Sequence, residues 1–149
     1  MSETVTASTE INVFVEGTPK GQPRPRAFAR NGVARVYDPG TAEHWKSQIA
    51  LAVKDIRPDA PLSGPVSVEV SFRLPRPKRL MRKSDPAGLI PHAGKPDLDN
   101  LVKAVFDALS TVGVWKDDAQ VVNCLAEKWY AAKHNSAGAR LIVREMGGE

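Results

Sequence analysis

Alternating apolar and polar residues predict the strands of a β-sheet. Over residues 65–74, valine, phenylalanine and leucine alternate with serine, glutamate and arginine, which is typical of a strand with one buried face. Residues 11–16 alternate in the same way and stop at Gly17. Residues 121–131 and 139–145 are apolar enough to form two further strands, although the irregular alternation over 121–131 leaves its buried face undefined.

Apolar residues at helical spacing predict two helices. The first follows a start signal at residues 38–41, with Asp38 or Thr41 as its cap, and stops before Pro58. The second begins at Leu98 and ends near Ser110, with Gly113 shortly after. The apolar faces are Ala42, Trp45, Ile49, Ala52, Val53 and Ile56 in the first helix, and Leu98, Leu101, Val102, Val105, Phe106 and Leu109 in the second. We expect Trp45 to be a core residue rather than a base-stacking one.

The segments between these elements complete the expected fold. Asn31-Gly32 is a strong turn signal and predicts a hairpin of residues 26–30 and 33–37. Residues 75–96 are rich in proline and have no period, so we expect a long flexible basic loop there. Residues 1–10 predict a disordered tail. The sequence thus predicts an α/β fold, with a single small domain over residues 11–149 in which two main helices pack against a mixed β-sheet.

Composition points to an ordinary cytoplasmic protein. The 149 residues are 42% apolar and 26% charged, which is normal for a globular domain. The longest apolar run, residues 49–53, is far short of the ~20 residues that a membrane span needs, and no secretory signal opens the chain. The single cysteine, Cys124, rules out an internal disulfide and fits a reducing compartment.

Positive charge is concentrated in two runs that contain no acid, in a chain of net charge +4. The runs lie over residues 18–36 and 73–83. Such clustering is typical of proteins that bind the phosphates of nucleic acids, although solubility alone is the alternative. The basic residues are Lys20, Arg24, Arg26, Arg30 and Arg35 in the first run, and Arg73, Arg76, Lys78, Arg79, Arg82 and Lys83 in the second.

Acidic residues gather around the second helix. Asp97 and Asp99 stand at its start, Lys103 follows Asp99 by one turn, and Asp117 and Asp118 follow its end. Each has a simple alternative role as a helix cap, an ion-pair partner or a polar turn residue. Together, the acids would repel one another, and a divalent cation would remove that cost. Oxygen ligands suit magnesium, which could activate water against a phosphodiester while Lys103 balances the developing charge.

Other chemistries fit less well. One cysteine and three scattered histidines offer no zinc set. No glycine-rich turn between a strand and a helix suits a nucleotide cofactor. Neither Ser110 nor Cys124 has an evident base partner in the sequence.

The acidic stretch resembles a known family. The segments KPDLDNL (residues 95–101), KAV (103–105) and WKDDAQV (115–121) are similar to those of the RusA-type Holliday-junction resolvases of bacteria and phages. Residues 17–26, with their prolines and Arg-Pro-Arg, resemble the same family more weakly. The resemblance is specific over residues 95–121 and weaker elsewhere.

The resemblance implies a RusA-like fold and symmetric nicking of four-way DNA junctions by a magnesium-dependent homodimer. It implies manganese as a substitute metal, and cytoplasmic location in a bacterial cell or phage-infected host. By motif position, the metal ligands are Asp97, Asp99 and Asp118, and the essential lysine is Lys103. Asn100, Asp107 and Asp117 are supporting candidates. The expected DNA-binding residues are Lys20, Arg24, Arg26, Arg76, Lys78, Arg79, Arg82, Lys83 and Lys95.

Two alternative functions remain open from sequence. The chain could be a metal-dependent nuclease of other branched DNA, or a junction-binding module without catalytic activity whose acids serve only as caps. A nucleotide cofactor and a membrane partner are not expected.

Overall fold

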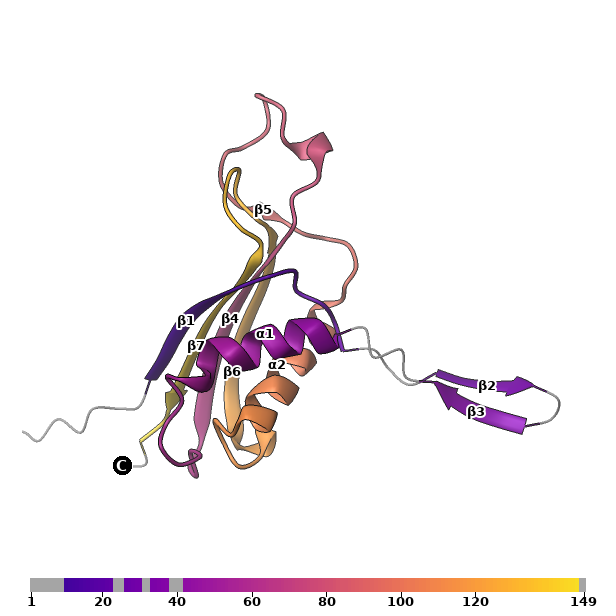
Figure 1. Cartoon of the computed structure of the whole chain (residues 1–149). Helices are drawn as coiled ribbons and strands as arrows, with labels where there is room; N and C mark the ends of the chain where they lie inside the picture. The colour runs from indigo at the N-terminus through magenta and orange to yellow at the C-terminus, as the bar shows by residue number, and fades with distance from the viewer. Residues whose placement is uncertain (1–9, 23–25, 31–32, 38–41, 148–149) are drawn as a thin grey trace, which may run out of the picture.

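The computed structural model describes residues 10–22, 26–30, 33–37 and 42–147, and the side chains of residues 10–22 and 42–147. A twisted β-sheet forms the centre of the molecule, and both helices lie across one of its faces (Figure 1). The core therefore lies between the helices and this face of the sheet. No helix of the described residues covers the other face of the sheet.

Five strands make the sheet, in the order β1-β7-β4-β6-β5. β4 and β6 run parallel, whereas all other neighbouring pairs are antiparallel. The predicted mixed α/β sheet is thus confirmed. The strands are β1 (Glu10–Glu16), β4 (Val66–Leu74), β5 (Ile90–Pro91), β6 (Val121–Tyr130) and β7 (Gly138–Glu145).

The alternation of β4 is confirmed residue by residue, since its valine, phenylalanine and leucine side chains are buried and its polar ones are not. β6 follows β4 along its whole length, with a register shift next to Val66. This irregularity and the position of β6 near the sheet edge explain why residues 121–131 show no clear buried face in their sequence pattern. The predicted start of β1 was one residue late, because Glu10 pairs with Arg144; residues 1–9 of the expected tail lie outside the described residues.

Helix α1 (Glu43–Lys54) buries Trp45, Ile49 and Val53 against the sheet, which confirms Trp45 as a core residue. Two details of the prediction were wrong. The N-cap position is Ala42, which makes no side-chain capping hydrogen bond, and not Asp38 or Thr41, which lie outside the described residues. The helix ends at Lys54, so Ile56 falls beyond it and is 47% exposed instead of joining the apolar face.

Helix α2 (Leu98–Val112) begins where the sequence predicted and ends two residues later than Ser110. Gly113 terminates it in the left-handed conformation, with φ of 85°, which glycine adopts without the steric cost of a Cβ atom. The buried residues of α2 are Leu101, Ala104, Val105, Ala108 and Leu109.

The predicted hairpin is confirmed as β2 (Arg26–Arg30) and β3 (Val33–Tyr37), which pair antiparallel. Its turn, Asn31-Gly32, lies outside the described residues. In Figure 1 the hairpin stands away from the sheet and helices. Among the described helices, none is both long and apolar enough to cross a membrane.

The connection between β4 and α2 contains more structure than the sequence predicted. It holds a 3-10 helix, η1 (Lys78–Leu80), and strand β5, which pairs with the end of β6. Figure 1 shows this connection beyond one end of the sheet. The expectation of a segment without secondary structure is therefore wrong at these two places.

Gln120 fixes the turn between α2 and β6, at the opposite end of the sheet. Its side-chain oxygen accepts hydrogen bonds from the backbone N–H groups of Lys116 and Asp117, at 2.9 and 2.8 Å. Its side-chain nitrogen donates to the carbonyl oxygens of Leu62 and Gly64, at 2.8 and 2.9 Å. One amide therefore ties the short 3-10 helix η2 (Asp118–Gln120) and the residues before it to the segment that leads into β4.

We predict that Gln120→Leu lowers the free energy of unfolding by about 2 to 4 kcal/mol, because four backbone groups lose their partner at once. Urea unfolding followed by circular dichroism measures this. Gln22→Leu is the control for a smaller loss, since the side chain of Gln22 accepts a single hydrogen bond among the described residues, from Lys46 at 3.0 Å. Equal losses for the two variants would contradict the role given to Gln120.

Candidate catalytic site and nucleic-acid interface

Asp97 occupies the cap position of α2 but does not act as a cap. Its backbone is extended, with φ of −70° and ψ of 144°, and its side chain accepts no hydrogen bond from the first turn of the helix. The carboxylate instead pairs with the exposed Lys95, whose Nζ lies 3.0 Å from Oδ1. The simple explanation of Asp97 as a capping residue is therefore wrong, and its half-exposed carboxylate lies beside an exposed cation.

Asp99 lies in the first turn of α2, two positions after Asp97. Its Oδ1 accepts a hydrogen bond of 2.9 Å from the backbone N–H of Asn100. The partial positive charge at a helix start favours carboxylates there. Asp97 and Asp99 are thus placed where the helix itself stabilises negative charge.

Two neighbouring segments fix this end of α2. Lys128 of β6 donates from Nζ to the carbonyl oxygens of Gly94 and Pro96, at 2.6 and 2.9 Å, and so anchors the backbone just before Asp97. On the other side, the backbone N–H of Gln22 donates to the carbonyl oxygen of Asn100 at 2.9 Å. A Cβ atom on Gly21 would lie only 3.0 Å from that of Asn100, so this close approach requires glycine or a small shift.

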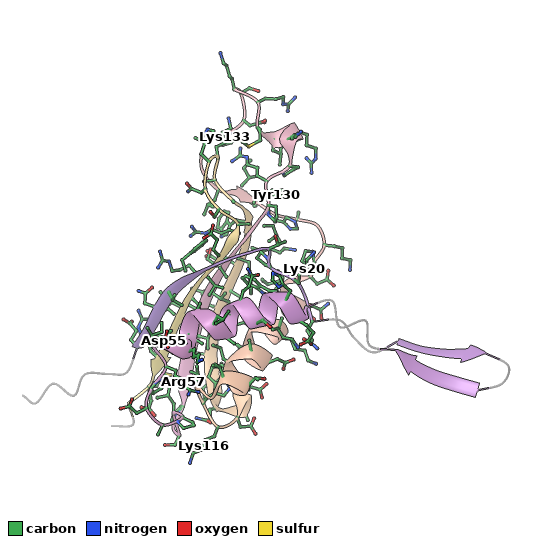
Figure 2. All side chains as sticks on the ribbon, in the orientation of Figure 1. Lys20, Asp55, Arg57, Lys116, Tyr130 and Lys133 are labelled. Atoms are coloured by element: carbon green, nitrogen blue, oxygen red, sulfur yellow. The ribbon has the colours of Figure 1, made fainter. Side chains whose placement is uncertain are left out.

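The same contact places Lys20 near the start of α2. Lys20 is exposed and belongs to the segment that lies against Asn100 (Figure 2). The expected DNA-binding run at residues 18–26 thus begins beside the acidic pair. Arg24 lies outside the described residues, as does the side chain of Arg26.

Further along α2, Lys103 and Asp107 follow Asp99 at helical spacing on one face. Asp107 has an ion-pair partner in α1, because its Oδ2 lies 3.9 Å from Nζ of Lys46. Lys46 is largely buried and also contacts Glu43 at 3.2 Å. Asp107 therefore contributes to the contact between the two helices.

Asp118 lies at the other end of this face. Loss of hydration is the main cause that raises the pKa of its carboxyl group. A hydrogen bond with Asp117 and the negative charges of Asp117 and Asp107 raise this pKa further, whereas the positive charge of Lys103 lowers it. Asp117 is itself engaged as a cap, since its Oδ1 accepts from the backbone N–H of Ala119 at 2.9 Å. Asp117 therefore has a clear structural role, and Asp118 is the better candidate of the two for the site.

The three expected metal ligands do not form one cluster within a single chain. Over the described part of the chain, no group of three or more His, Cys, Asp and Glu side chains is arranged to hold a metal ion. Asp97 and Asp99 remain a pair of carboxylates of the kind that magnesium uses together with water and substrate phosphates.

The expected DNA-binding residues of the β4–α2 connection divide into two kinds. Lys78, Arg79, Arg82, Lys83 and Lys95 are exposed. Arg76 is partly buried, and its guanidinium donates to backbone carbonyl oxygens. Arg79 and Arg82 each use one guanidinium nitrogen, toward Tyr130 and Asp85 respectively. Arg76 differs from them because Nε and both terminal nitrogens donate to backbone carbonyl oxygens.

Sequence reasoning missed three residues that hold the site in place: Gln120, Lys128 and Lys133. Each is a long polar side chain that donates to backbone carbonyl oxygens of another segment. Gln120 belongs to the motif of residues 115–121, which was a usable signal. Lys128 and Lys133 had none, because nothing in their local pattern indicates which distant carbonyl groups they meet.

Comparison with known proteins agrees with the motifs. The model of the endodeoxyribonuclease RusA family matches residues 16–142. The chain is 39% identical over 141 residues to "Uncharacterized protein YqaN" of Bacillus subtilis (strain 168), a match that covers 91% of this chain and 96% of the relative.

Relatives with a stated activity are more distant. The chain is 29% identical over 127 residues to "Crossover junction endodeoxyribonuclease RusA" of Escherichia coli (strain K12), covering 85% of this chain and 91% of the relative. The protein of the same name from Enterobacteria phage 82 matches with the same identity and coverage. The family match covers most of the chain, including the whole acidic site, and the chain therefore belongs to the endodeoxyribonuclease RusA family.

Proposed function

We propose that this endonuclease resolves four-way DNA junctions by paired nicks, with magnesium as its cofactor and manganese as a substitute. The observation that carries the proposal is the acidic pair at the start of α2, where Asp97 does not cap the helix and the segment that carries Lys20 lies alongside. The names of the relatives from Escherichia coli and phage 82 support the junction as the substrate. The cytoplasm of a bacterial cell or phage-infected host supplies such DNA.

Asp97 and Asp99 would hold the metal ion, and Asp118 is the third candidate ligand. A bound magnesium ion would supply activation of water and stabilisation of the leaving oxygen. Both carboxylates lie at the start of α2, where the partial positive charge of a helix end favours negatively charged groups. Lys103, one turn further along, is exposed and positioned to balance negative charge that develops on the phosphate.

We predict that Asp97→Asn and Asp99→Asn each lower the cleavage rate of a labelled four-way junction by at least ~100-fold, because each removes a charge that the reaction uses. Binding of the junction should survive in both variants. Gel analysis of nicks, with and without magnesium, measures cleavage, and a mobility-shift assay measures binding.

Asp59→Asn is the matched control, since Asp59 is an exposed acid between α1 and β4. Cleavage that persists unchanged in the α2 variants would show that the acids are only structural, as in a junction-binding module. Equal cutting of four-way junctions, flaps and plain duplex by the wild type would show a less selective nuclease. Unpaired nicks would contradict the symmetric mechanism.

The proposal includes a homodimer, and the free edge of β6 is the surface that supports it. β5 pairs only with Trp129 and Tyr130, so within the described residues no strand pairs the outer edge of β6 from Val121 to Glu127. Val122 and Leu125 are 62% and 55% exposed on this strand. Residues 121–126 carry no charge, whereas edges that stay unpaired in solution usually do. A second copy related by a two-fold axis would cover this edge in both chains.

We predict that Leu125→Lys converts a dimer to a monomer in light-scattering measurements across a range of concentrations, because charges on the edge oppose strand pairing. Leu51→Lys is the matched control, since Leu51 is 71% exposed on α1, away from the β6 edge. A wild type that is monomeric at all concentrations would contradict the dimer. A Leu125→Lys protein that remains dimeric would place the interface elsewhere.

A further inference from the structure

Arg76 is the centre of a hydrogen-bonded network just after β4. Its Nε donates to the carbonyl oxygen of Leu80 at 2.8 Å. One terminal nitrogen, Nη1, donates to the carbonyl oxygen of Gly88 at 3.0 Å and more weakly to that of Ala131, at 3.5 Å. The other, Nη2, donates to the carbonyl oxygen of Pro86. One guanidinium thus joins both ends of residues 76–88, which we call the basic lobe, to the end of β6.

Lys133 holds the same lobe from the turn before β7. Its Nζ donates to the carbonyl oxygens of Arg82 and Asp85, at 2.6 and 2.9 Å. Its backbone N–H donates to the carbonyl oxygen of Ala87 at 2.9 Å. In Figure 2, Lys133 lies among the side chains of the lobe, beyond Tyr130.

These two cations differ from the others of the lobe in the groups they meet. Their hydrogen-bond acceptors are backbone carbonyl oxygens, so both side chains hold the backbone itself. The charge of Lys133 also acts on the nearby carboxylate of Asp85. Lys78, Arg79, Arg82 and Lys83 are exposed, and Arg82 has 72% of its side chain exposed. The lobe therefore contains an inner pair of cations that organises the backbone and an outer set that faces solvent.

We propose that Arg76 and Lys133 are positioning residues for DNA binding. They hold the lobe in shape before DNA arrives, so that the outer cations meet the phosphates without a further ordering step. The inference rests on the proposed function, because phosphates of DNA are the partner. It also changes the role of Arg76 from a phosphate contact to a residue that acts through its neighbours.

The two roles have different thermodynamic signatures. A cation that contacts a phosphate releases counterions, so its removal lowers the slope of log K against log salt by roughly 0.9. A positioning residue contacts no phosphate, so its removal leaves the slope unchanged. The lobe must then be ordered on binding, and ordering the backbone of even one residue weakens affinity by about tenfold.

The experiment compares Arg76→Gln and Lys133→Gln with the contact controls Lys78→Gln and Lys83→Gln. Dissociation constants for a four-way junction are measured without magnesium at several salt concentrations. Amide hydrogen exchange over residues 79–88 is measured in the free protein. We expect the positioning variants to exchange faster, to bind about tenfold more weakly and to keep the wild-type slope. The contact controls should keep wild-type exchange and lose roughly one unit of slope.

A conservative variant and a stability measurement keep the outcome clear. Lys133→Arg retains a charged donor, so its lobe should exchange as slowly as that of the wild type. Thermal unfolding identifies any variant in which the whole domain is unfolded. A lower slope with unchanged exchange in Arg76→Gln would overturn the inference, because it shows a phosphate contact. Unchanged exchange in both positioning variants would also overturn it. A wild type that binds no junction would refute the proposed function, and exchange alone would then decide whether these residues hold the lobe.

Discussion

The packing of α2 against the sheet is the interaction on which the candidate site depends. Burial of Leu101, Val105 and Leu109 removes apolar surface from water and fixes the rotation of the helix about its axis. Asp99, Lys103 and Asp107 must then lie on the outer side, since three and four residues separate neighbours along one face. Burial of the apolar face therefore determines which side chains of α2 face solvent. Residues with no part in catalysis thus place the residues of the candidate site.

Packing alone does not fix the segments that enter and leave α2. These are irregular, so their backbone groups lack the repeated partners of a helix or sheet. Single side chains supply those partners: Gln120 after the helix, Lys128 before it, and Arg76 with Lys133 in the basic lobe. The same kind of contact occurs at both ends of the sheet. A long polar side chain from a regular element or its flank satisfies carbonyl groups of an irregular one.

The regular elements were predictable, and the contacts between irregular segments were not. β4 alternates because one face is buried along its length, so its pattern is visible in the sequence. β6 shows no clear alternation of apolar and polar residues. Its outer edge is exposed, so apolar side chains are less strongly required on either face. Asp97, Asp99 and Lys103 could be found from their motif. Their separation from Asp118 could not, since it depends on how α2, η2 and β6 meet in space.

The roles of the basic residues show that a charge pattern in the sequence does not predict what each cation does. Arg76 and Lys78 stand two positions apart in one acid-free run and are equivalent by composition. Their environments differ because only Arg76 points to the carbonyl groups of the lobe, where a planar guanidinium can serve several acceptors at once. Its hydrogen-bond acceptors are neutral, so its charge still contributes to the field that steers DNA toward the protein, whereas the phosphate contacts that set the equilibrium salt slope are made by other residues. A residue can therefore contribute to the approach of a polyanion without touching it. The sequence shows where positive charge is concentrated, but only the structure distinguishes the cations that are free to contact phosphates from those that hold the backbone.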